Sequence, residues 1–129
     1  MVSKIEVDAL SGASSAGVMT VVGEGGSTTT SLQQGLAKCW VNFNGTSTIA
    51  TRDSFNVTGL VDNGTGSYNV TIANDMANAN FSVVSGGSGT EKMIGIDSHA
   101  ASTFRTFNYA GGSAEDATIL SYIVDGDLA

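Results

Sequence analysis

Apolar and polar residues alternate in short runs over most of the chain from residue 39 onward. Two runs show the alternation most clearly, CWVNFN at 39–44 and YNVTI at 68–72. Successive side chains of a β-strand point to opposite faces of its sheet, so this pattern is typical of strands with one buried face. Tyr68, Val70 and Ile72 are expected to point inward. In the first run Cys39, Val41 and Phe43 share one face and Trp40, Asn42 and Asn44 the other, and Cys39 is expected to be a buried structural thiol.

Further short strands are expected along the same stretch, with turn residues between them. They lie at 48–50, 54–60, 81–84, 93–96, 104–109 and 119–124. Asn44-Gly45 is typical of a hairpin turn, and residues 62–66 (DNGTG) mark the next tight reversal. Seven to eight short strands at this spacing predict an all-β domain over residues 39–129, either an antiparallel β-sandwich or a jelly-roll-like fold.

Residues 1–30 carry two apolar segments between linkers rich in glycine and serine. Residues 4–10 alternate, with Ile5 and Val7 on one strand face, and residues 18–22 are mostly apolar. A two-stranded unit is marginally stable at best in water, so these segments need another surface, either the chain's own β domain or a neighbouring subunit. We interpret residues 1–30 as an extended arm that docks on a partner. The alternative is a flexible tail that docks on nothing.

Residues 31–38 (SLQQGLAK) are the one helix candidate. A hydroxyl residue at the start can cap the first turn, and Leu32 and Leu36 lie one turn apart on the same face. The segment is only about two turns long and Gly35 weakens it. Two interpretations stay open: a short helix that gathers both leucines with those of other subunits around an axis, and a capped turn packed on its own domain.

Composition supports the β assignment and excludes several classes of function. Gly, Ser, Thr and Asn are abundant, whereas charged residues make up only 13% of the 129-residue chain, about half the usual share. The formal net charge of −7 argues against nucleic-acid binding, which needs clustered Lys and Arg. No apolar run reaches the roughly 18 to 20 residues that cross a membrane, and the first residues lack the features of a signal peptide. We therefore expect neither nucleic-acid binding nor membrane insertion nor secretion.

Residues able to carry catalysis or bind a metal are scarce. The one histidine, His99, and the one cysteine, Cys39, cannot supply a four-ligand zinc site or an internal disulfide. An isolated histidine does not indicate a catalytic triad, which is assembled from separated elements. Residues 62–64 and 125–127 carry oxygen ligands for calcium, but they lack the twelve-residue loop pattern and are turn formers first. We expect no enzyme activity, no metal and no cofactor.

Three stretches of the chain resemble a known protein family. Residues 37–46 (AKCWVNFNGT), 52–58 (RDSFNVT) and 62–70 (DNGTGSYNV) are similar to a segment of tail-fibre-like and other virion-surface proteins of tailed bacteriophages, including marine and cyanobacterial phages. The leading residues 4–12 (KIEVDALSG) also look like the start of such fibre proteins. Residues beyond Asn80 carry no comparable motif.

The resemblance implies a non-enzymatic virion structural protein, a homotrimer made in the bacterial host cytoplasm and located on the virion surface. It implies a tail-fibre or fibre-tip module that is attached to another virion protein through its N-terminal arm and presents a β domain for host adsorption. The alternative is a capsid-bound head fibre or decoration (knob) protein. The candidate trimer or anchor contacts are Ile5, Val7, Leu10, Val18, Val21, Leu32 and Leu36.

Loops at the end of the β domain are the expected site of host contact, because loops on a rigid scaffold often carry binding. The candidate residues for a host surface glycan or protein are His99, Arg105, Phe107 and Tyr109. A glycan-cleaving enzyme has little support, since the chain has a single histidine and a low density of charge.

Overall fold

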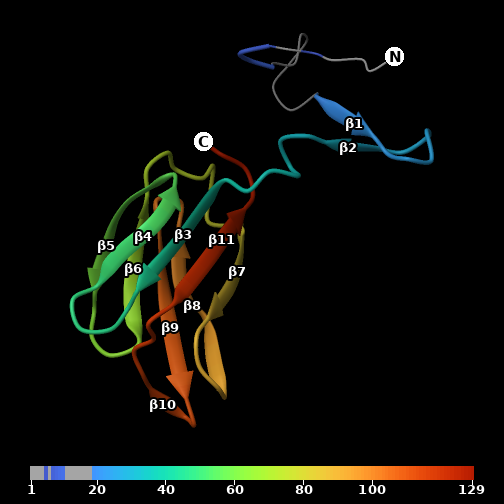
Figure 1. Ribbon diagram of the computed structural model, residues 1–129. Helices are drawn as coiled ribbons and strands as arrows, with labels where there is room; N and C mark the ends of the chain where they lie inside the picture. Colours follow the sequence, from blue (N-terminus) through green and yellow to red (C-terminus); the bar gives the residue numbers. More distant parts are fainter. Residues whose placement is uncertain (1–4, 6, 11–18) are drawn as a thin grey trace. The chain divides into compact units, whose positions relative to one another are not determined.

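A computed structural model describes residues 5, 7–10 and 19–129 of the chain. The described residues form an all-β structure with eleven antiparallel strands in three sheets and no helix (Figure 1). Accordingly, no helix in this part of the chain is long and apolar enough to cross a membrane. The chain divides into two compact units, Met1–Leu36 and Ala37–Ala129, which we call the N-terminal unit and the β domain.

Two antiparallel sheets make up the β domain (Figure 1). The four-stranded sheet has the order β4 (Ala50–Phe55), β3 (Cys39–Asn44), β11 (Leu120–Asp125) and β7 (Ser82–Gly87). The five-stranded sheet contains β5 (Val57–Asp62), β6 (Ser67–Ile72), β8 (Lys92–Ala100), β9 (Thr103–Ala110) and β10 (Ser113–Ala114). Strand β9 is central in this sheet: β8 pairs along its whole length on one edge, and β6 and β10 share the other edge.

The hydrophobic core lies between these two sheets. Tyr68, Val70 and Ile72 are buried, as predicted for β6, and in β3 the buried face is that of Cys39, Val41 and Phe43, so the alternation predicted for both strands is confirmed. Aromatic rings join the sheets: the centroids of Phe43 and Tyr68 lie 5.3 Å apart edge-on, and those of Phe104 and Tyr122 lie 5.8 Å apart. The β domain therefore has a core of its own, which the N-terminal unit is not needed to complete.

Both expected hairpins form, but for different local reasons. Residues 63–66 reverse the chain between β5 and β6 with Gly64 at a φ of 114°, which only glycine adopts easily. Between β3 and β4 the left-handed residue is Ser47, not Gly45. Gly45 is needed there because a Cβ atom would lie 2.6 Å from the Tyr68 hydroxyl oxygen. The glycine at the predicted turn thus serves close packing rather than the turn itself.

Two predicted strands are wrong in their extent. Residues 48 and 49 of the strand expected at 48–50 belong to the turn between β3 and β4, and only Ala50 is in a strand, as the first residue of β4. Residues 54–60 do not form a single strand, because the chain leaves the four-stranded sheet at Phe55 and enters the five-stranded sheet at Val57. Asn56 makes this corner with a φ of 57°, a conformation that asparagine tolerates better than most residues. Its side-chain amide donates hydrogen bonds to the carbonyl oxygens of Lys38 and Asn74, at 2.9 and 3.1 Å. These bonds fix the crossing between the sheets.

The N-terminal unit contains a two-stranded sheet, β1 (Thr20–Val22) paired with β2 (Thr29–Ser31). Residues 18–22 were expected to be an apolar strand, and β1 covers most of that segment, whereas Val18 lies outside the described residues. No strand forms over 5 and 7–10, the described part of the alternating run 4–10. This run finds no partner strand among the described residues to pair with, and its apolar side chains are exposed.

The short helix predicted over residues 31–38 does not form. Turns occupy this segment, with the Gly35 N–H donating to the Ser31 carbonyl at 3.2 Å and the Leu36 N–H donating to the Gln33 carbonyl at 3.4 Å. The Gln34 N–H donates to the Ser31 hydroxyl at 3.4 Å, as in a capped turn. A segment this short, with a glycine inside it, cannot offset the cost of helix nucleation.

Candidate functional site

The outer face of the five-stranded sheet brings together three of the predicted host-contact residues. In β9 the side chains of residues 104, 106 and 108 are buried, so Arg105, Phe107 and Tyr109 point outward in one row. They belong to a strand, which corrects the expectation that they lie in loops at the end of the domain. The strand expected at 104–109 forms as part of β9, so these residues lie within it and not in the two-residue loop before β10.

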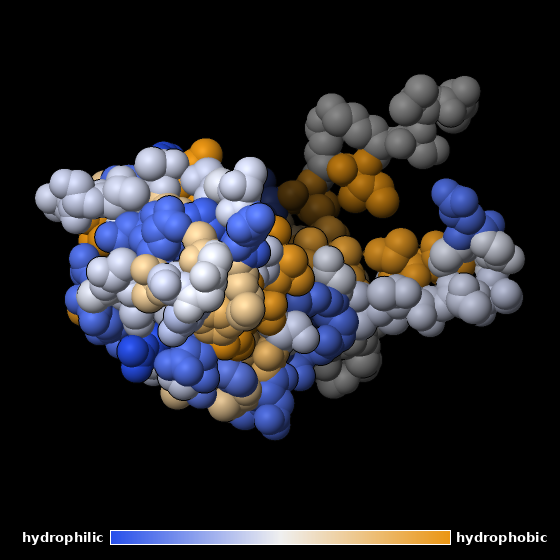
Figure 2. All heavy atoms as spheres, turned by 90° about the horizontal axis from the view of Figure 1, so that it is seen from below, coloured by the Kyte–Doolittle hydropathy of each residue, from blue (hydrophilic) through white to orange (hydrophobic). Residues whose placement is uncertain are grey.

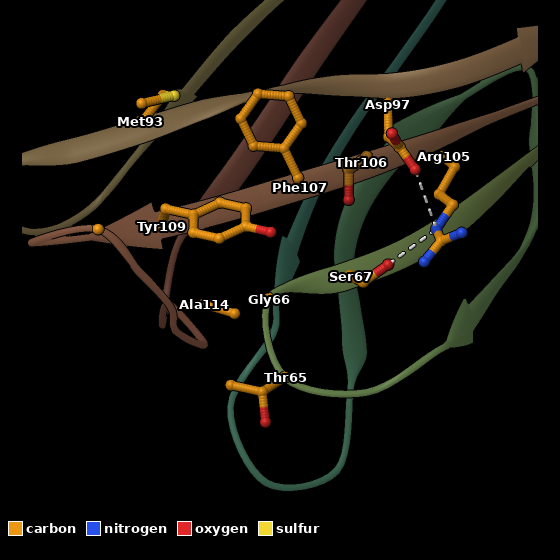
Figure 3. Close-up of a pocket in the computed structure, with 11 residues that line it drawn as sticks. Thr65, Gly66, Ser67, Met93, Asp97, Arg105, Thr106, Phe107, Tyr109 and Ala114 are labelled. Atoms are coloured by element: carbon orange, nitrogen blue, oxygen red, sulfur yellow. Dashed lines mark hydrogen bonds and ion pairs between the residues drawn. The ribbon is translucent and has the colours of Figure 1, made fainter.

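A groove of about 430 Å³ opens on this face (Figure 3). Its size falls within the range of small-molecule sites. Residues from β6, β8, β9 and β10 and from the loops beside β6 and β10 line it: Thr65, Gly66, Ser67, Met93, Asp97, Arg105, Thr106, Phe107, Tyr109, Gly112 and Ala114. We call it the β9 groove. Residues far apart in the sequence meet here because β9 pairs with both β6 and β8.

Aromatic rings form one end of the β9 groove. The rings of Phe107 and Tyr109 have centroids 5.7 Å apart and an interplanar angle of 65°. Gly95 faces Phe107 across the β8–β9 pair, and a Cβ at that position would lie 2.9 Å from the ring. The glycine thus leaves room for the phenyl ring against β8. Met93, opposite Tyr109, adds a further exposed apolar side chain.

Charged and hydroxyl groups form the other end (Figure 3). The Arg105 Nε–H donates to the Ser67 hydroxyl at 3.0 Å and lies 3.6 Å from the Asp97 carboxylate. Asp97 stands at the register shift in β8 between Ile96 and Ser98, which places it beside Arg105. Both charged side chains are about half exposed, at 47% and 56%. The pair leaves this end of the groove with no net charge.

A buried hydrogen-bond network supports the lower wall of the groove. The Gly66 N–H donates to the Asp116 carboxylate at 2.8 Å, and the Tyr68 hydroxyl lies 2.5 Å from the same oxygen. That hydroxyl is also 2.7 Å from the Gly45 carbonyl oxygen. Burial and the neighbouring Asp116 carboxylate raise the pKa of Tyr68 above its usual value, so the phenol stays protonated and able to donate. This network links the loop at Gly66 to the core.

His99, the fourth predicted host-contact residue, lies outside the β9 groove. It is in β8, with its ring centroid 4.9 Å from that of Phe81. Together with Arg105 it lines a second hollow of about 340 Å³. The structure therefore brings three of the four candidates into one groove and places the fourth beside it.

The candidate metal ligands and the cysteine singled out in the sequence are placed as follows. No group of three or more His, Cys, Asp or Glu side chains converges in this part of the chain. Burial raises the pKa of the Cys39 thiol to about 11, so it is not a thiolate at neutral pH. Asp62 and Asp125 accept hydrogen bonds from the backbone N–H groups of Gly64 and Gly126, as turn residues do.

The outer face of the four-stranded sheet carries a second feature, which sequence reasoning missed. Val84, Ile123, Trp40 and Phe55 stand opposite one another on β7, β11, β3 and β4. We call these four residues the apolar row. Val84, Ile123 and Phe55 are 68%, 49% and 54% exposed. The next row along the sheet is polar, with the Asn42 amide donating to the Ser121 hydroxyl at 2.5 Å. The apolar residues Trp40 and Ile123 on outward positions of their strands could have indicated an apolar face. Only the order of the strands in the sheet shows that these residues stand side by side.

In comparisons with known proteins, no family model, no curated protein and no solved structure matches the chain.

Proposed function

We propose that the chain is a non-enzymatic virion structural protein, a trimeric tail-fibre or fibre-tip module that is attached by its N-terminal arm and presents a β-sandwich domain for host adsorption. One observation supports this most directly. The β domain has a complete core, whereas the described apolar side chains of the N-terminal unit are largely exposed (Figure 2). A self-sufficient domain joined to an incomplete apolar segment suits an attachment arm.

The exposed side chains of the N-terminal unit are those of the predicted anchor. Ile5, Val7 and Leu10 are 85%, 56% and 65% exposed, and Val21 is 52% exposed. Burying such a side chain stabilises a complex by about 1.5–3 kcal/mol, so several of them supply the energy of a stable attachment. Leu36 is exposed and Leu32 half-buried, while Val18 lies outside the described residues. The proposed partner of this segment is another virion protein.

The finer description of the fold is part of the proposal. Two sheets whose inner faces meet in one aromatic and aliphatic core fit a β-sandwich. The chain passes between the sheets after β4, β6, β7 and β10, with hairpins inside each sheet. Such a domain presents two outer faces, one with the β9 groove and one with the apolar row.

Self-association is supported by the apolar row. With ordinary strand spacing and rise, a face of four six-residue strands measures roughly 19 by 20 Å. The area of this face is about half of the area that a stable interface buries on each partner. The face alone is thus too small, so we propose that the arm contributes the remainder of the trimer contact. A trimer would carry three times the chain's net charge of −7, which opposes clumping of particles.

Localisation on intact virions tests this proposal. We expect antibody-gold label, or density in a particle reconstruction, at the tail. Label spread over the capsid would favour the head-fibre or decoration role instead, and absence from purified virions would overturn both. Light scattering tests the trimer separately: a species of about 13 kDa at micromolar concentration would contradict self-association of the isolated chain.

A further inference from the structure

We propose that the β9 groove binds a neutral saccharide unit, and that the Arg105–Asp97 pair selects against anionic sugars. The inference rests on the proposed function only for the origin of the ligand, a glycan of the host surface. The groove itself is defined by its own geometry: two aromatic rings at one end, a balanced ion pair and hydroxyl groups at the other.

The aromatic end fits the apolar face of a sugar ring. A pyranose exposes a patch of C–H groups on one face, and such a patch packs on an aromatic ring through dispersion and contact with the negative face of its π-system. Tyr109 is 39% exposed and Phe107 is half-buried against Gly95. Their rings lie at a steep angle to each other, so they form a corner rather than a single shelf.

The polar end fits the hydroxyl groups of the same sugar. Neighbouring hydroxyls on a ring each donate and accept, so they need an acceptor and a donor side by side. The Asp97 carboxylate can accept a hydrogen bond from a sugar hydroxyl. The Arg105 Nε–H already donates to Ser67, but the guanidinium has further N–H groups that can donate to the sugar. Thr65 and Ser67 add hydroxyl groups at the rim.

Charge balance decides between neutral and acidic sugars. A carboxylate on the ligand would approach Arg105, but Asp97 lies 3.6 Å from the same guanidinium and would repel it. The chain's net charge of −7 adds to that repulsion at longer range. A neutral, hydroxyl-rich ligand is repelled neither by Asp97 nor by the net charge of the chain.

Hydrogen bonding within the sheet argues against an extended peptide as the ligand. A peptide that joins a sheet needs an unpaired strand edge. Arg105, Phe107 and Tyr109 come from β9, which is paired on both edges by β8, β6 and β10. At these three residues a ligand therefore meets side chains and not free backbone groups of β9. The other edge of β8 has no partner strand among the described residues, so a peptide panel tests that route.

Binding to immobilised neutral hexose oligosaccharides and to matched uronic-acid oligosaccharides tests the inference. We expect the full chain to bind at least one neutral member, and Tyr109→Ala to weaken that binding by at least tenfold. The matched control is Val61→Ala, which removes an exposed apolar side chain from β5, outside both the groove lining and the apolar row, and should bind as the wild type does. Equal thermal unfolding midpoints of the two variants would exclude misfolding.

Asp97→Asn tests the selectivity. This change leaves Arg105 without its carboxylate partner, so we expect the preference for neutral over uronic-acid oligosaccharides to fall at least tenfold. Several results would overturn the inference: no binding to any saccharide, equal loss with Val61→Ala, a wild-type preference for acidic sugars, or binding to a peptide panel that Tyr109→Ala abolishes. None of them alters the localisation test, so failure here is distinguishable from failure of the proposed virion role.

Discussion

Replacing Asn56 tests how the chain crosses between the two sheets of the β domain. Its amide donates to the carbonyls of Lys38 and Asn74, and its side-chain oxygen accepts from the Asn74 N–H at 2.7 Å. The residue holds a φ of 57°. Asn56 thus makes three hydrogen bonds to backbone groups of two different segments.

The expected cost follows from these contacts. Each hydrogen bond contributes about 0.5–1.5 kcal/mol, and because the site is only partly buried we take the lower half of that range. Asn56→Gly, which keeps the left-handed backbone at no steric cost, should therefore lower the free energy of unfolding by about 2 kcal/mol. Asn56→Ala adds the cost of placing a Cβ in the left-handed region, about 1 kcal/mol, for a total near 3 kcal/mol.

Urea unfolding followed by fluorescence of Trp40, the chain's one tryptophan, measures both values. Asn63→Ala is the control, since its exposed amide makes one side-chain bond, to Asn69, and its loss should cost no more than about 0.5 kcal/mol. If Asn56→Ala unfolds within about 0.5 kcal/mol of the wild type, or is more stable than Asn56→Gly, the role given to this corner is refuted.

Three further predictions follow from the core and from the apolar row. Gly45→Ala should lower the free energy of unfolding by about 2–3 kcal/mol, because its Cβ would lie 2.6 Å from a buried tyrosine hydroxyl. Gly59→Ala is the control: it has open space around it and should leave the free energy of unfolding unchanged, and urea unfolding measures both variants. As the pH rises from neutral, stability should begin to fall near pH 9: burial raises the pKa of Cys39 from 9.0 to about 11 and that of Tyr122 from 10.0 to about 12, so the unfolded chain loses these protons first. Urea unfolding at a series of pH values checks this, and in Cys39→Ala the fall should begin near pH 10; stability that rises with pH in this range would contradict the assignment. Ile123→Lys should abolish self-association in sedimentation velocity while leaving the unfolding midpoint nearly unchanged, and an oligomer that survives the change would exclude the apolar row as its interface.

The sequence by itself determined the two faces of β3 and the buried face of β6. Alternation with a period of two is a local property of the backbone, so Tyr68, Val70 and Ile72 could be placed inward without knowing any neighbouring strand. Likewise the reversal at 63–66 follows from turn residues that are adjacent in the chain. The same local rules also suggested a helix at 31–38, which fails because a two-turn segment containing glycine has too little to stabilise it.

Only the tertiary structure decided which outward residues meet. The β9 groove combines Ser67 with Asp97 and Arg105, and the apolar row aligns Phe55 with Ile123, because strands distant in sequence pair side by side. That lateral order depends on how two sheets share one core, and no local pattern encodes it. The corner at Asn56 is of the same kind, since its hydrogen-bond partners become neighbours only when both sheets have formed.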